Sequence, residues 1–138
     1  ERPVWQKGLL RDERFVAALR IDPLLLDWPT AARRLTEWGY GVGEGFSAHT
    51  VSEVRRFLAD WTRRLEARYL MVSLSAEFAC PAPTDCAQLI EQAVLPHCRE
   101  FGLPFALMLG VRRAVNPRLR LAGDGVGQSD LTALSHLC

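Results

Sequence analysis

The sequence lacks an excess of charge of either sign. Its 17 lysines and arginines stand against 16 acidic residues, which gives a formal net charge of +1. A protein that holds nucleic acid or an anionic membrane through its overall field needs a clear basic excess. The composition therefore predicts partners other than nucleic acid or a membrane surface.

Long hydrophobic runs are also lacking. The longest nearly uncharged stretch, residues 101–111, is about half of the roughly 20 residues that span a bilayer. No charged segment followed by an apolar one, as in a secretory signal, opens the sequence. We expect a cytoplasmic protein.

Cysteine is sparse, and its spacing is uninformative. The four cysteines show neither the C-x-x-C spacing of zinc and redox motifs nor the density of a secreted disulfide scaffold. We expect ordinary free thiols at Cys80, Cys86, Cys98 and Cys138.

The sequence does contain enough apolar material for one core, with 49% hydrophobic residues in 138. Short apolar runs predict three buried strands, and apolar spacings of three and four residues predict four helices between and after them. The third strand opens into a long, glycine-rich loop that ends near residue 128. This order predicts an α/β fold whose parallel sheet is covered on both faces. The predicted strands are 15–21, 69–73 and 104–110; the predicted helices are 29–38, 51–67 with a capping box of Thr50 and Glu53, 84–101 with a bend at Pro96 and an end at Gly102, and one capped by Ser129.

Polar residues follow the predicted strands where ligand sites lie in parallel sheets, at the carboxyl ends. Arg20 and Asp22 end the first strand, and Arg113 and Asn116 follow the third. Guanidinium forks beside a carboxylate and an amide suit a carboxylate or a polyhydroxy ligand. The alternative is an Arg–Asp pair that only ties a strand to a loop.

Candidates for proton transfer or metal binding are few. Glu77 and Asp124 lie in loops near the strand ends and could exchange protons with a ligand, although solvated loop carboxylates are the simpler interpretation. The histidines His49, His97 and His136 all fall in or beside predicted helices, away from the strand ends. The residues therefore predict no metal site and leave any catalytic residue unassigned.

Three segments together resemble the uronate isomerase (glucuronate isomerase-like) family of the metal-dependent amidohydrolase superfamily. They are F-A-L-M-L-G-V-R-R at 105–113, N-P-R-L-R-L-A-G-D-G-V-G at 116–127, and L-R-I-D at 19–22. The second is similar to the family's Arg- and Asn-rich loop with its Gly- and Asp-rich turn, and the third to its R-P-D strand end.

The resemblance implies a (β/α)8 TIM barrel with its site at the carboxyl face of the strands. It also implies aldose–ketose isomerisation of hexuronates of the glucuronate and galacturonate type, with a divalent Zn or Mn ion in the whole enzyme. Carried over by position, the substrate-binding residues are Arg20, Asp22, Arg113, Asn116 and Asp124.

The chain departs from the family at the metal site. Met108 stands where the family commonly has a histidine, and a thioether is a poor ligand for Zn or Mn. The residues thus support no metal within this chain. Eight strand–helix units take about 250 residues, so we expect residues 1–138 to be a single-domain fragment of about three βα units, completed by the rest of the barrel or by another copy. The alternative is a non-catalytic α/β module that binds a sugar acid or a protein partner.

Overall fold

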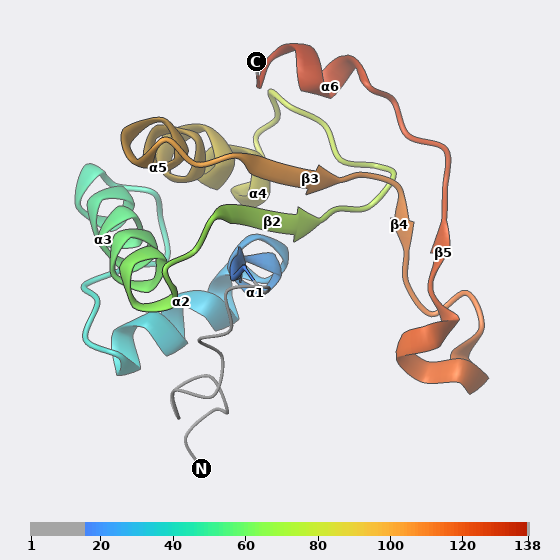
Figure 1. Cartoon of the computed structure of the whole chain (residues 1–138), viewed down its shortest axis with the longest axis horizontal. Coiled ribbons are helices and arrows are strands. Elements are labelled where there is room, and N and C mark those ends of the chain that lie inside the picture. Colours follow the sequence, from blue (N-terminus) through green and yellow to red (C-terminus); the bar gives the residue numbers. More distant parts are fainter. Residues whose placement is uncertain (1–15, 138) are drawn as a thin grey trace.

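The computed structural model describes residues 16–137, which build an α/β fold around a three-stranded parallel sheet. The strands are β1 (Ala18–Arg20), β2 (Tyr69–Ser73) and β3 (Phe105–Met108), and they lie in the order β1-β2-β3 (Figure 1). All three lie within the runs that predict strands; Phe15, the first residue of those runs, is outside the described residues. Consecutive parallel neighbours need a crossover, and helices supply each one.

Three helices separate β1 from β2, one more than the sequence predicts. The predicted helix 29–38 is present as α2, and 51–67 as α3. The additional short helix begins at Asp22, directly before Pro23. Proline is tolerated in the first turn of a helix, so Asp22 can start one. The bounds are α1 (Asp22–Leu26), α2 (Trp28–Glu37) and α3 (Ala48–Leu65).

The start of α3 differs from the predicted capping box. Ser47, not Thr50, is the N-cap, and its Oγ accepts a hydrogen bond from the Thr50 amide at 3.1 Å. Glu53 accepts from the amide of Gly41 at 2.7 Å instead of reaching back to the cap. Both serine and threonine suit a cap, so the sequence placed this helix start three residues too late.

One continuous helical stretch connects β2 to β3. It consists of α4 (Asp85–Leu89), the π-helical segment η2 (Ile90–Val94) and α5 (Leu95–Phe101). The predicted disturbance at Pro96 is present as the π-helical turn that precedes it, because proline lacks the amide that would continue the α pattern. Gly102 ends the stretch with φ of 62°, as predicted. No helix among residues 16–137 is long and apolar enough to cross a membrane.

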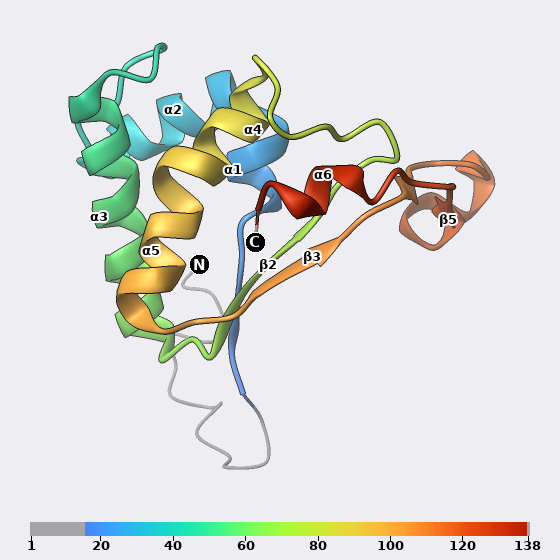
Figure 2. The same cartoon turned by 90° about the horizontal axis from the view of Figure 1, so that it is seen from above.

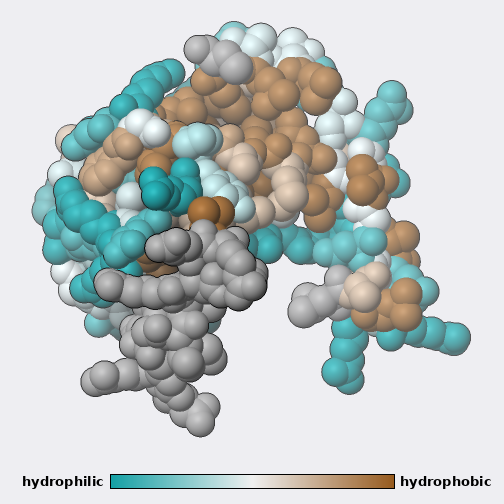
Figure 3. Space-filling model, in the orientation of Figure 1, coloured by the Kyte–Doolittle hydropathy of each residue, from teal (hydrophilic) through white to brown (hydrophobic). Residues whose placement is uncertain are grey.

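Helices cover one face of the sheet and leave the other open in the described part of the chain (Figure 2). Leu19, Leu70 and Val72 point to the covered face and are buried. Their neighbours along the strands alternate to the open face, where Arg20 pairs with Met71 and Met71 with Ala106. The expectation that both faces are covered is therefore not met here. Figure 3 looks onto the open face and shows mostly hydrophobic surface over the strands.

The loop predicted after β3 contains structure of its own. Residues 111–127, called the arm below, form an antiparallel pair of short strands joined by a 3₁₀ helix, and they project from the body (Figures 1 and 3). Two main-chain hydrogen bonds fix the base: Val111 N to Leu74 O at 3.0 Å and Gly127 N to Gly110 O at 2.6 Å. The bounds are β4 (Val111–Arg112), η3 (Pro117–Gly123) and β5 (Gly125–Val126).

The last helix, α6 (Thr132–Ser135), begins later than predicted and is not capped by Ser129. Asp130 accepts instead from the Thr132 amide at 2.8 Å. The Ser129 hydroxyl is buried and makes no hydrogen bond within residues 16–137.

Candidate functional site

Asp22 lies at the carboxyl end of β1 and is the centre of a cluster of polar groups. Its side chain is 13% exposed. Arg20 donates to it through Nε at 3.1 Å and through Nη2 at 3.0 Å, and the Ser73 amide donates to Oδ1 at 3.2 Å. The site thus joins the ends of the neighbouring strands β1 and β2, as the predicted sheet edge requires.

The electrostatics of the cluster keep Asp22 ionised. Burial alone would raise the pKa of this carboxyl, but hydrogen bonds from Arg20 and the Ser73 amide outweigh burial and lower the pKa below 3.8. In turn the carboxylate raises the pKa of Arg20. At neutral pH the pair is therefore a carboxylate held by a guanidinium in a two-point contact, a geometry that fixes both groups.

Arg113 comes to the same carboxylate from the arm. Its Nη2 lies 3.6 Å from Asp22 Oδ1, and its Nη1 donates to Asp124 Oδ2 at 3.1 Å. Asp124 also accepts from the Ala114 amide at 2.9 Å, which holds this carboxylate against the arm's backbone. Four of the five predicted substrate-binding residues thus form one string of alternating charge: Arg20, Asp22, Arg113 and Asp124.

Asn116, the fifth predicted residue, lies apart from this string. Its Oδ1 accepts from the Arg118 amide at 3.2 Å and caps η3, and its own amide donates to Gly123 O at 3.0 Å. These contacts give Asn116 a role in shaping the arm.

Donor groups remain available in the cluster. Within residues 16–137, Arg20 Nη1 and Arg113 Nε make no hydrogen bond to the protein, and the two side chains are 56% and 51% exposed. Asp22 and Asp124 balance the charges of Arg20 and Arg113, so the four side chains carry no net charge, and the free N–H groups of the two guanidiniums are the groups left for a ligand. An anionic, hydrogen-bond-accepting ligand suits this arrangement.

The described residues do not fit a metal ion. Between residues 16 and 137 there is no group of three or more His, Cys, Asp or Glu side chains placed to bind one. His97 is buried in α5, whereas His49 is exposed on α3 and His136 is exposed directly after α6. Met108, at the end of β3, is 42% exposed on the open face of the sheet.

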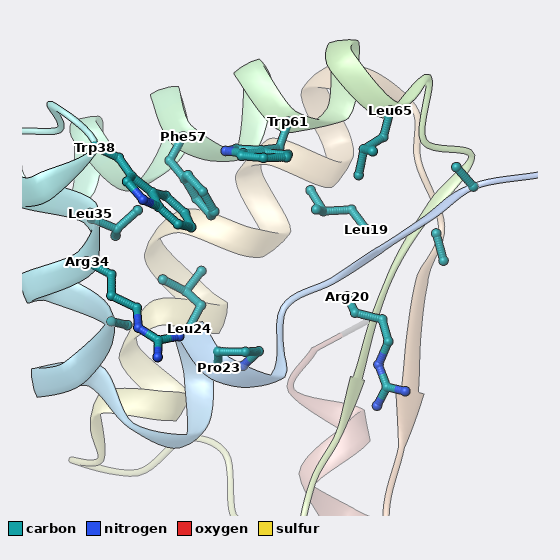
Figure 4. A pocket seen from close by; sticks show the side chains of 13 residues that line it. Leu19, Arg20, Pro23, Leu24, Arg34, Leu35, Trp38, Phe57, Trp61 and Leu65 are labelled. Atoms are coloured by element: carbon teal, nitrogen blue, oxygen red, sulfur yellow. The ribbon is translucent and has the colours of Figure 1, made fainter. Parts of the chain in front are cut away.

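A second concave feature lies on the other side of β1 and has a different character. It is an apolar cavity of about 510 Å³ between β1 and the helices α1–α3. Trp38, Phe57 and Trp61 line it, whereas the Arg20 guanidinium points away from it (Figure 4). The cavity and the polar cluster therefore share Arg20, which lines the cavity while its guanidinium points away from it.

Ser73 is the cluster residue that sequence reasoning missed. The stretch Tyr69–Ser73 predicts a strand whose end is a place for a ligand site, but the prediction assigns no role to the Ser73 side chain. The available signal was its place at the end of the strand beside β1, because ends of adjacent parallel strands meet at one edge.

Comparison with solved structures identifies a match. The chain is similar to the crystal structure of a uronate isomerase from Bacillus halodurans C-125, with a TM-score of 0.91 and 39% sequence identity over 96% of this chain. The resemblance to the uronate isomerases is thereby confirmed. The match covers 32% of the other chain, so this chain spans about a third of the length of that uronate isomerase. No protein-family model and no curated protein matches the sequence.

Proposed function

We propose that this chain supplies three βα units and part of the substrate-binding face of a TIM-barrel enzyme that interconverts the aldose and ketose forms of hexuronates. The likeness to a solved uronate isomerase supports the enzyme class. Three adjacent parallel strands, helical on one face and open on the other, fit a sector of a barrel wall whose open face is the lumen. The arginine pair around Asp22 is the observation that carries the substrate class.

The cluster would bind the carboxylate of the hexuronate. Arg20 Nη1 offers two N–H groups, and Arg113 Nε offers a third from the arm on the other side of Asp22. Each would make a charge-assisted hydrogen bond, which is about twice as strong as a neutral one. Asp22 holds the two guanidiniums in place and, being ionised, can also accept from a sugar hydroxyl.

The divalent ion that the resemblance implies does not fit the residues that the structure describes, 16–137. We therefore assign binding and orientation of the substrate to residues 16–137 and route no step of the reaction through a metal held by them.

Calorimetric titration with D-glucuronate tests the proposal. Arg113→Ala removes a charge-assisted hydrogen bond, and such bonds contribute about 1.5–3 kcal/mol, so affinity should fall at least about tenfold. Arg118→Ala is the matched control, because it removes an exposed arginine of the same arm that has no contact with Asp22 in the described structure. Equal affinities for the two variants, or no binding at millimolar glucuronate, would refute the proposed site.

An isomerisation assay separates the enzyme from the alternative. Ketose formation from D-glucuronate by the intact protein, followed by NMR with added Zn or Mn, is expected of the enzyme. Binding of glucuronate without any isomerisation would instead identify the non-catalytic sugar-acid-binding module.

A further inference from the structure

Ser73 contacts both members of the Arg20–Asp22 pair, through different atoms. Its amide donates to Asp22 Oδ1 at 3.2 Å, and its Oγ accepts from Arg20 Nη2 at 3.3 Å. The residue is 6% exposed. The main chain of Ser73 therefore holds the carboxylate, and its side chain holds the guanidinium.

The contact with Ser73 Oγ is the third hydrogen bond that holds the Arg20 guanidinium in one orientation. Nη2 has two N–H groups, of which one donates to Asp22 Oδ1 at 3.0 Å and the other to Ser73 Oγ. Nε donates to Asp22 Oδ2 at 3.1 Å. Since the guanidinium is planar and rigid, three bonds on one side set its plane and leave the Nη1 edge as the free one.

Ser73 is itself held firmly. It ends the central strand of the sheet, in register with Met108 of β3, and the next residue, Leu74, donates from its amide to Met108 O at 2.8 Å. On the other side Ile21 N donates to Met71 O at 3.0 Å. The hydroxyl thus sits on backbone that is tied to both neighbouring strands, which is where a positioning group is most effective.

We propose that Ser73 is a positioning residue that orients Arg20 so that its Nη1 edge faces the carboxylate of the bound ligand. This inference rests on the proposed function for the ligand, but the orientation of Arg20 is a property of the free protein. It can therefore be measured with and without ligand.

The first measurement is made without ligand. In Ser73→Ala the hydrogen bond from the main-chain amide to Asp22 remains, and only the Oγ acceptor is lost. The rotation of the Arg20 guanidinium, measured by NMR exchange at its Nη groups, should therefore become about threefold to tenfold faster. Ser75→Ala, an exposed serine two residues further on, should leave the rate unchanged. Equal rates in Ser73→Ala and the wild type would overturn the proposal.

The second measurement compares D-glucuronate with its uncharged amide. Ser73→Ala should weaken glucuronate binding about threefold to tenfold and leave binding of the amide unchanged, with Ser73→Thr restoring the difference. An equal loss for both ligands would indicate a merely structural role and overturn the proposal. If the wild type binds neither ligand but the Arg20 guanidinium rotates faster in Ser73→Ala, the proposed function fails and the positioning of Arg20 by Ser73 stands.

Discussion

His97 in α5 should make the stability of the protein depend on pH in the range where free histidine titrates. The side chain is fully buried; its Nε2 lies 3.0 Å from Thr62 Oγ1 of α3, and its Nδ1 has no hydrogen-bond partner in the part of the chain described. Phe101 packs against the ring, with centroids 4.4 Å apart. Burial lowers the pKa of His97; Glu100 raises it somewhat, and Arg55 and Arg63 lower it further.

The sign and size of the effect follow from this lowered pKa. Well above pH 6.5 the imidazole is neutral in both the folded and the unfolded chain and has no influence on the pH dependence. Below that value the unfolded chain takes up a proton that the folded protein resists, so stability falls as the pH falls. For an imidazole that stays neutral in the fold, the loss between pH 7 and pH 5 is at most about 1.9 kcal/mol.

Urea unfolding at a series of pH values measures this loss. His97→Gln keeps a neutral polar group near Thr62 but cannot titrate, so the variant should lose less stability than the wild type between pH 7 and pH 5. His136→Gln, in an exposed position, should behave like the wild type. The reasoning is refuted if His97→Gln shows the same pH dependence as the wild type.

Two other changes test the cluster and the arm. Asp22→Asn should destabilise the protein by about 1–2 kcal/mol at pH 7, because both arginine partners are about half exposed and the pair is only partly desolvated. Since the Asp22 pKa is lowered, the stabilisation by this carboxylate is complete above about pH 3.8 and is lost as the pH falls through the pKa of the folded state. The difference in unfolding free energy between variant and wild type should therefore be smaller at pH 3 than at pH 7. Gly110→Ala should weaken the main-chain contact at the base of the arm, because Gly110 has φ of 90° and a Cβ there would lie 2.6 Å from Gly127 O. Hydrogen exchange at the Gly127 amide should become at least about tenfold faster. An unchanged exchange rate would contradict this.

The sheet was predictable from sequence because each strand is a short apolar run with a clear boundary. Tyr69–Ser73 is bounded as predicted, and the ends of all three strands meet at one edge, which brings Arg20 and Asp22 to the site. The sequence-based resemblance to the uronate isomerases also agrees with the solved structure that this chain matches. The strand order and the placement of these residues at strand ends were therefore predicted from the sequence, and their role in binding substrate stays a prediction.

Predictions of local structure were wrong where several neighbouring residues suit the same structural role. Ser47 and Thr50 are both good N-caps, and only the backbone before α3 decides between them. The arm was predicted as a loop because strands of two residues, such as Val111–Arg112, have no detectable period. The role of Ser73 was not predictable because it depends on a contact to Arg20, 53 residues away in the sequence.

The central claim is that the strand-end arginines bind the carboxylate of a hexuronate, and an NMR titration with D-glucuronate tests it most directly. The account predicts saturable shifts of the Arg20 and Arg113 Nε–H resonances and of the Ser73 amide, with the indole resonances of Trp38 and Trp61 in the apolar cavity unmoved. Shifts confined to those indoles, or arginine resonances that stay in place at millimolar glucuronate, would contradict it.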